Sequence, residues 1–231
     1  MNALLDRLDA WRHLPNYQLE RRADILFALV LPQVMSTFVG QPVRGTLIPE
    51  FPIKRDLIWP DKPTRKSVKV DYLALSEDGS TAWLVELKTD SASRRDAQDH
   101  YLKTASALGL GALLTGYIDI LQGTSAHQKY AHLTFELAGM GLLNVPPEVR
   151  ENAFPTVKTR QLRAALKGIT VGRMPTDVRV LYVQPGGGDA ESVMDFAYVA
   201  DALEQMDTPL ACRFATSLRT WRTAAGAVEP R

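Results

Sequence analysis

Two neighbouring segments with alternating side chains constrain the fold of this chain more than any other feature. Residues Ser67–Leu75 read SVKVDYLAL, and successive side chains of a strand point to opposite faces. One face would carry Val68, Val70, Tyr72 and Ala74, and the other Lys69, Asp71, Leu73 and Leu75. Thr81–Thr89 (TAWLVELKT) predicts a second strand, and the polar turn Glu77–Gly79 should join the two into an antiparallel hairpin.

The segments before the hairpin predict a helix and an edge strand. Leu19–Leu31 carries apolar residues at helical spacing, and Pro32 should end or kink that helix. Val43–Lys54 predicts a strand, but Pro49 and Pro52 cannot donate backbone hydrogen bonds. We therefore expect this strand at the edge of the sheet.

The chain after the hairpin predicts more helices and one more strand. The helices are expected from Ser91 or Ser93 to about Ala107, and over Leu113–Leu121, Ala126–Leu142 and Glu191–Met206, with a strand at Val178–Val183. This order predicts an α/β fold with a central mixed sheet flanked by helices. Because Pro146 and Pro147 mark a boundary, we expect a core over 1–145 and a C-terminal strand and helices over 146–231 that complete or extend the same domain.

Composition excludes several classes of protein. The 231 residues include 27 Lys plus Arg and 26 Asp plus Glu, so a net charge of +1 gives no global reason to bind nucleic acid or membrane. A single cysteine, Cys212, rules out a disulfide framework, and we expect it to be buried. The apolar run Ile25–Leu31 is too short to span a bilayer, and Ala105–Leu121 contains Asp119. We expect a cytoplasmic protein without a membrane partner.

The hairpin brings together residues that can do chemistry. Pairing through its turn would set Asp71 opposite or diagonal to Glu86, within roughly 5–8 Å at Cβ, and Lys88 would share the face of Glu86. Two buried carboxylates repel each other, and a divalent cation resolves that conflict. Oxygen ligands of this kind suit Mg²⁺ or Mn²⁺, and Lys88 could orient the attacking water or stabilise charge on phosphorus.

The same residues carry a family resemblance. Asp71, fourteen further residues and then Glu86-Leu87-Lys88, on a hairpin followed by a helix, resemble the PD-(D/E)XK superfamily. The resemblance covers roughly residues 18–110, and Val70 stands where the motif has its proline. It implies a restriction-endonuclease-like core and a Mg²⁺-dependent nuclease that hydrolyses nucleic acid phosphodiesters, with DNA as the expected substrate. The implied metal ligands are Asp71, Glu86 and the Leu87 carbonyl, and Lys88 is the implied catalytic lysine.

Two flanking helices add to the resemblance. The family often takes a further acid from its first core helix, where Glu20 is the matching residue and Glu50, beside the first strand, is its rival. Gln98 and Tyr101 resemble the Gln and Tyr of the RecB-like branch, where the usual spacing is four rather than three. These two residues are expected to orient the site or contact phosphate.

Other readings remain open. The chain could be a catalytically silent nuclease-fold module that binds nucleic acid or a protein, or an effector activated by a partner, and a homodimer would help to cut both strands. Residues 54–69 hold six Lys or Arg against two Asp, so together with Trp59 this stretch could touch a phosphate backbone or be a solvated loop. For His100 and the other histidines we expect core or surface roles.

Overall fold

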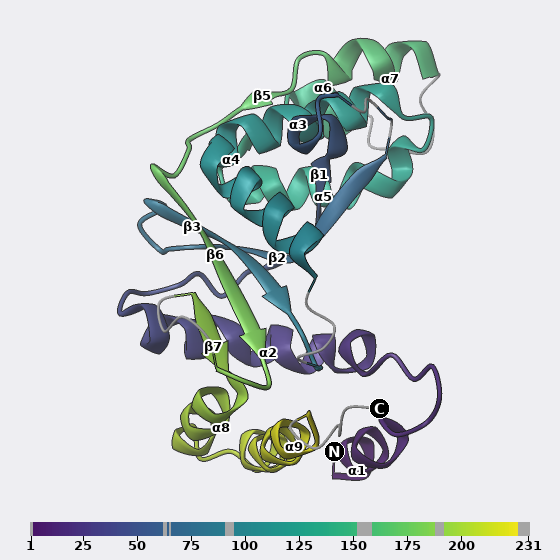
Figure 1. The fold of residues 1–231 in the computed structure, drawn as a ribbon. Helices are drawn as coiled ribbons and strands as arrows, with labels where there is room; N and C mark the ends of the chain where they lie inside the picture. Colours follow the sequence, from purple (N-terminus) through teal and green to yellow (C-terminus); the bar gives the residue numbers. More distant parts are fainter. Residues whose placement is uncertain are drawn as a thin grey trace.

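A mixed sheet of five strands runs through the middle of the molecule, with helices on both faces (Figure 1). The computed structural model describes residues 2–61, 64, 66–90, 95–151, 159–187 and 192–225. In sheet order the strands are β1 (Ile48–Lys54), β2 (Ser67–Leu75), β3 (Thr81–Leu87), β6 (Asp177–Gln184) and β7 (Val193–Asp195). The first three run antiparallel to one another, and β3, β6 and β7 run parallel. The expected α/β class with a mixed sheet is confirmed.

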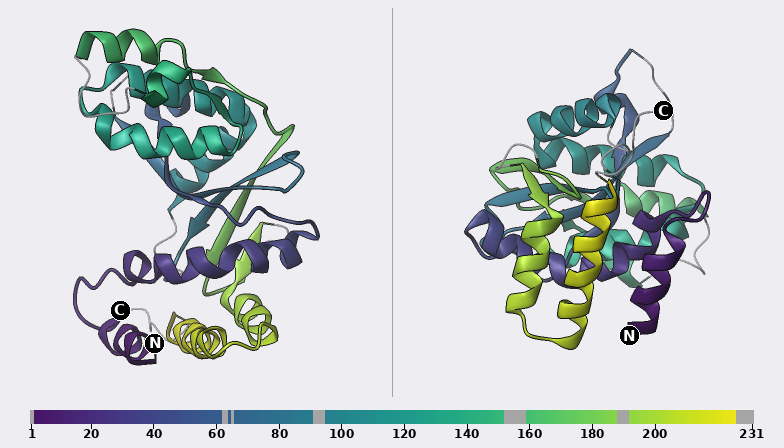
Figure 2. Two further views of the ribbon diagram at one scale, coloured as in Figure 1. Left: turned by 180° about the vertical axis from the view of Figure 1, so that it is seen from behind. Right: turned by 60° about the horizontal axis from the view of Figure 1, so that its bottom comes forward.

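Helices cover each face of the sheet and bury a separate core there. The core on one face includes side chains of α1 (Asn2–Trp11), α2 (Leu19–Val39), α8 (Phe196–Gln205) and α9 (Pro209–Ala225), with α1 and α9 beyond α2 in Figure 1. The other face packs against α3 (Arg55–Ile58), α4 (Asp96–Gly123), α5 (His127–Gly139), α6 (Pro147–Glu151) and α7 (Thr159–Leu166). A second small sheet joins β4 (Leu143–Asn144) to β5 (Thr170–Val171). Figure 2 shows the sheet from two further sides, between the two helical layers.

The predicted hairpin is confirmed, and its register follows from burial on both faces. Leu73 pairs with Leu84 and Tyr72 with Val85, so the same register continued by one residue sets Asp71 across from Glu86. A slip of one residue would exchange the two faces, which both lie against cores. β3 ends at Leu87, but its parallel pairing continues because the Lys88 amide donates to the Val183 carbonyl at 2.8 Å.

β1 is the edge strand that its prolines predict. Its pairing with β2 is recorded on either side of Glu50, at Pro49 and Phe51. Glu50 itself has a positive φ of 53°, a backbone conformation that is costly for a residue other than glycine. This interruption lies beside Asp71, which the continued β1–β2 register places opposite Glu50.

Of the two outcomes predicted at Pro32, an end of the first helix is wrong, because α2 continues through it to Val39. An interior proline costs roughly 3 kcal/mol. The turns beyond it bury Val34 and Met35 completely, and burial of each such side chain is worth roughly 1.5–3 kcal/mol. The core contacts therefore offset the lost hydrogen bond, and the Ser36 hydroxyl donates to the Pro32 carbonyl at 2.7 Å.

The helices predicted after the hairpin are confirmed in part. The two helices expected over 91–121 are present as the two parts of α4, which meet at a break at Gly109, where φ is 77° and ψ is 158°. Ser91 and Ser93 lie outside the described residues. The segment predicted as a helix from 191 first forms β7, and α8 begins at Phe196 because the Asp195 carboxylate accepts the Tyr198 amide at 2.8 Å.

The C-terminal part of the chain shares the sheet and the helical layer of the first part. β6 lies between β3 and β7, and α9 lies beside α1 (Figure 2). Asp9 joins these two helices, since it accepts from Trp221 Nε1 at 2.8 Å, Ser217 Oγ at 3.0 Å and Arg213 Nη2 at 2.7 Å. Cys212 is exposed on α9, so its predicted burial is wrong.

Two helices, α2 and α4, are long and apolar enough to cross a membrane by length and composition alone. In each, 39% of the most apolar window is buried inside the protein. Both helices pack on the sheet, and core helices of water-soluble proteins pass the same test.

Candidate active site

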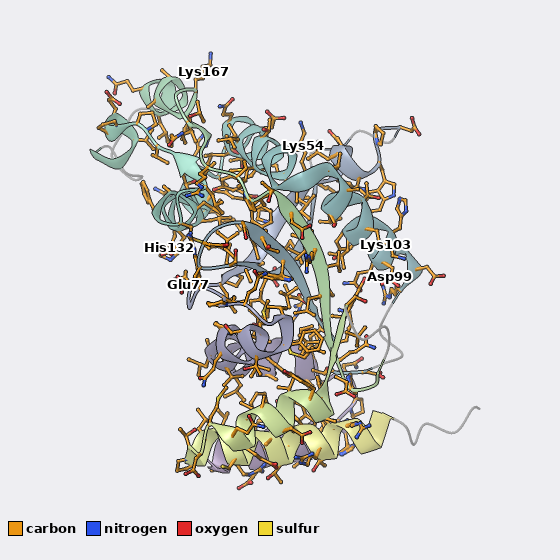
Figure 3. All side chains as sticks on the ribbon, turned by 90° about the vertical axis from the view of Figure 1, so that its left-hand side faces the viewer. Lys54, Glu77, Asp99, Lys103, His132 and Lys167 are labelled. Carbon is orange, nitrogen blue, oxygen red and sulfur yellow. The ribbon has the colours of Figure 1, made fainter. Side chains whose placement is uncertain are left out.

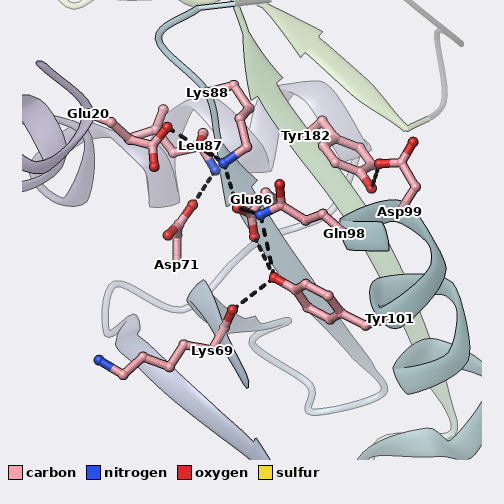
Figure 4. Close-up of polar contacts among 10 residues, drawn as sticks. All are labelled: Glu20, Lys69, Asp71, Glu86, Leu87, Lys88, Gln98, Asp99, Tyr101 and Tyr182. Carbon is pink, nitrogen blue, oxygen red and sulfur yellow. Dashed lines mark hydrogen bonds and ion pairs between the residues drawn. The ribbon is translucent and has the colours of Figure 1, made fainter. Parts of the chain in front are cut away.

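The residues predicted from the hairpin converge on one pocket at the end of β3 (Figure 4). Its volume is about 210 Å³, and Asp71, Glu86 and Lys88 all line it. Side chains of α2, β1 and α4 complete the walls. The register that sets Asp71 across from Glu86 puts both carboxyl groups on the same side of the sheet.

Glu86 is the most deeply placed acid of this site, with 2% of its surface exposed. Its Oε1 accepts from the Lys88 ammonium at 2.7 Å and from the Gln98 amide. Its Oε2 lies 3.4 Å from the Tyr101 hydroxyl, which donates to the Lys69 carbonyl at 2.9 Å. Gln98 and Tyr101 thus reach the site together, as expected of two residues on one helical face.

Lys88 is a buried cation held by oxygen atoms. It is 5% exposed, and its ammonium donates to Glu86 Oε1 at 2.7 Å and to the Leu87 carbonyl at 2.9 Å. Glu20 Oε2, from the first turn of α2, lies 3.5 Å away. The ammonium therefore contacts two of the oxygen atoms that the sequence predicts for a metal ion, one from Glu86 and one from the Leu87 carbonyl.

Asp71 is fixed by the backbone of the neighbouring strand. Its Oδ2 accepts the Leu87 amide at 2.7 Å. The peptide groups of Leu87 consequently serve both sides of the site, since its N–H holds Asp71 and its C=O holds Lys88.

Burial and mutual repulsion set the protonation of these acids. Burial, and then the Asp71 charge, raise the pKa of Glu86 to about 8, against the opposing effect of Lys88. Burial also raises the pKa values of Asp71 and Glu20. For Lys88, burial alone would lower the pKa, but Glu86, Glu20 and Asp71 together raise it. The site therefore attracts positive charge, and Lys88 stays protonated.

The two candidates for the fourth acid lie on different walls of the pocket. Glu20 faces Lys88 from α2, whereas Glu50 on β1 forms an ion pair with Lys69. The Tyr72 hydroxyl donates to the Asp24 carbonyl at 2.7 Å and so ties β2 to α2 one turn beyond Glu20. Strand periodicity does not predict this contact, because Tyr72 belongs to the opposite face of β2.

The pocket contains carboxylate and carbonyl oxygens, which are the ligand atoms that Mg²⁺ and Mn²⁺ prefer. Asp71, Glu86 and the Leu87 carbonyl could supply them. Among the residues that the structure describes, no three His, Cys, Asp or Glu side chains form a ready-made metal centre. The Lys88 ammonium engages two of the oxygens, so it would have to move before a metal ion could use them.

One further polar pair beside the site was not predicted. The Tyr182 hydroxyl of β6 donates to the Asp99 carboxylate at 2.6 Å, next to Gln98 at the start of α4 (Figure 4). This contact joins residues 83 positions apart and fixes the first turn of α4 against the sheet.

No family model, curated protein or solved structure matches this chain. The function proposed below therefore rests on the residues and on their geometry.

Proposed function

We propose that this chain is a metal-dependent nuclease with a restriction-endonuclease-like core, and that it hydrolyses nucleic acid phosphodiesters, with DNA as the expected substrate. The observation that carries the proposal is the pocket shared by Asp71, Glu86 and Lys88. A buried acid with a raised pKa, beside a second acid and a buried lysine, is typical of a functional site rather than of a solvated hairpin.

The order of the elements supports the same proposal. The resemblance implies a hairpin followed by a helix and preceded by a first core helix and a first strand, and β2 and β3 are followed by α4 and preceded by α2 and β1. The two acids stand on the second and third of these strands, and Gln98 and Tyr101 stand on the helix that follows.

Each residue would have a separate task. Asp71, Glu86 and the Leu87 carbonyl would hold Mg²⁺ or Mn²⁺, which supplies a polarised phosphoryl oxygen and an acidified water. Lys88, freed from Glu86, would donate hydrogen bonds to the attacking water or to the charged phosphoryl oxygens. Gln98 and Tyr101 would orient the Glu86 carboxylate, and Glu20 would hold the Lys88 ammonium nearby.

The direct test is incubation of the purified protein with linear, circular and single-stranded DNA, and with RNA, in Mg²⁺, Mn²⁺ or chelator. We expect cleavage only with metal, and a loss of at least roughly 100-fold in the Asp71→Ala and Lys88→Ala variants. Glu77→Gln, an exposed position in the turn of the same hairpin, is the matched control and should cleave normally.

The principal alternative is a silent module of the same fold. One observation favours it: the Lys88 ammonium donates hydrogen bonds to Glu86 and to the Leu87 carbonyl, so these oxygen atoms have a partner without any metal ion. Nucleic acid binding without cleavage in any metal, unchanged by Asp71→Ala, would favour this alternative and contradict the nuclease.

A further inference from the structure

An aromatic cluster lies beside the candidate site, between the end of α3 and the start of α4. The ring of Trp59 has its centroid 6.4 Å from that of His100 and 6.5 Å from that of Tyr101. The guanidinium of Arg55 lies over the Trp59 ring, 4.9 Å from its centroid. Three rings and a planar cation therefore lie close together.

Tyr101 joins this cluster to the site. Its ring neighbours Trp59, and its hydroxyl lies 3.4 Å from Glu86 Oε2. The cluster is thus one aromatic ring away from the acid proposed to take part in the chemistry.

The cluster is partly open to solvent, unlike two of the other three tryptophans. Trp83 and Trp221 lie in the core, with 2% and 0% of their surface exposed. Trp59 is half-buried, with part of its surface against the core of the α4 face, and His100 is exposed. Packing in the core explains why the inner side of the Trp59 ring is apolar. It does not explain why the outer part of this ring and the His100 ring lie together at the surface.

We propose that Arg55, Trp59 and His100 form a stacking platform for an unpaired nucleobase of the strand whose phosphodiester enters the site. This inference rests on the proposed function and names its substrate class: a single-stranded or frayed nucleic acid. Aromatic rings and Arg planes are the surfaces on which unpaired bases stack. In a duplex the faces of each base are covered by its neighbours, so a base must leave the stack before it can use the platform.

Charges of both signs stand near the platform in the sequence, although residues 54–69 as a whole hold six Lys or Arg against two Asp. Cations and acids alternate there, with Arg55 followed by Asp56, and Asp99 one turn before Lys103. Asp99 and Lys103 project from the same side of α4 (Figure 3). Because salt dependence comes from contacts to phosphates and not from base stacking, the contribution of Trp59 and His100 should depend only weakly on salt.

The test measures binding with chelator present, so that no strand is cut. Fluorescence anisotropy is recorded for a labelled single-stranded DNA, for a set carrying one abasic position each, and for the matching duplex. We expect Trp59→Ala to weaken binding of the intact single strand roughly 5- to 100-fold. If the abasic position removes the base that stacks, Trp59→Ala and the unaltered protein should bind that strand with the same affinity. They should also bind the duplex with the same affinity.

Control variants separate stacking from packing. Trp11→Ala removes an exposed tryptophan from α1, 42% accessible, and should leave all affinities unchanged. Should Trp59→Ala unfold, His100→Ala and Arg55→Gln carry the test, since both alter the outer part of the platform, and each should weaken single-strand binding at the same abasic-sensitive position.

Equal losses on intact, abasic and duplex strands, or no loss in these variants, would overturn the platform. The result is independent of hydrolysis. Base-dependent binding without cleavage in any metal would support the platform and contradict the nuclease. Cleavage without base-dependent binding would support the nuclease and contradict the platform.

Discussion

The Glu86 carboxyl group is buried, so its ionised form is less stable there than in water. Its pKa rises from 4.5 to about 8, chiefly through burial and then through Asp71. Between these two pH values the folded protein holds more protons than the unfolded chain. The contribution of Glu86 to the free energy of unfolding should therefore fall as pH rises from about 4.5 to about 8, and level off above the folded pKa.

The variant Glu86→Gln tests this residue in the absence of metal. It keeps the shape of the side chain and removes its charge, so at pH 9 it should be more stable than the unaltered protein by roughly 1–3 kcal/mol. The difference should vanish near pH 4.5, where both proteins carry a neutral group. Thermal unfolding with chelator at a series of pH values measures it. A less stable variant at pH 9 would show that the Lys88 pairing outweighs the burial of the charge.

The identities of the site residues could be predicted from sequence because a strand has a strict period of two. Asp71, Glu86 and Lys88 reach one pocket for that reason. The contacts of Trp59 could not be predicted, because they join a short helix to α4 across 41 residues, as the numbering of Trp59 and His100 shows. Periodicity within a segment carries no information on such a meeting.

Among the elements, α4 connects the site to the core. Its first half brings Gln98 and Tyr101 to Glu86, and its second half buries Leu113, Leu114 and Tyr117. The break at Gly109 lies between the two halves, with φ at 77° and ψ at 158°. Side chains with a Cβ rarely adopt that conformation, so glycine is required there for backbone reasons and not for space, since an added Cβ would meet nothing within 4 Å.

Gly109→Ala should therefore destabilise the protein by roughly 1–3 kcal/mol. Gly123→Ala, at the last residue of the same helix, is the matched control, because no atom lies within 4 Å of its added Cβ and its φ is not in the positive range. We expect Gly123→Ala to be neutral or slightly stabilising. Urea unfolding of both variants gives the comparison. Equal stability of the two would mean that α4 can run straight through position 109.

At the scale of the whole molecule, the sheet order depends on pairs that are distant in sequence. β3 and β6 pair in parallel although almost 90 residues separate them, and Asp9 holds α9 through Arg213, Ser217 and Trp221. The sequence predicted most of the elements by their periods. It could not predict that β7 precedes α8 or that the two ends of the chain meet, because these features depend on contacts between remote segments.

The central claim is that Asp71 and Glu86 can share one divalent ion. Calorimetric titration of Mn²⁺ into the metal-free protein tests this most directly, with Asp71→Ala beside it and Glu77→Gln as the control. The account predicts one ion bound per chain by the unaltered protein and by Glu77→Gln, and none by Asp71→Ala. Equal Mn²⁺ binding by Asp71→Ala, or no binding by any of the three proteins, would contradict it.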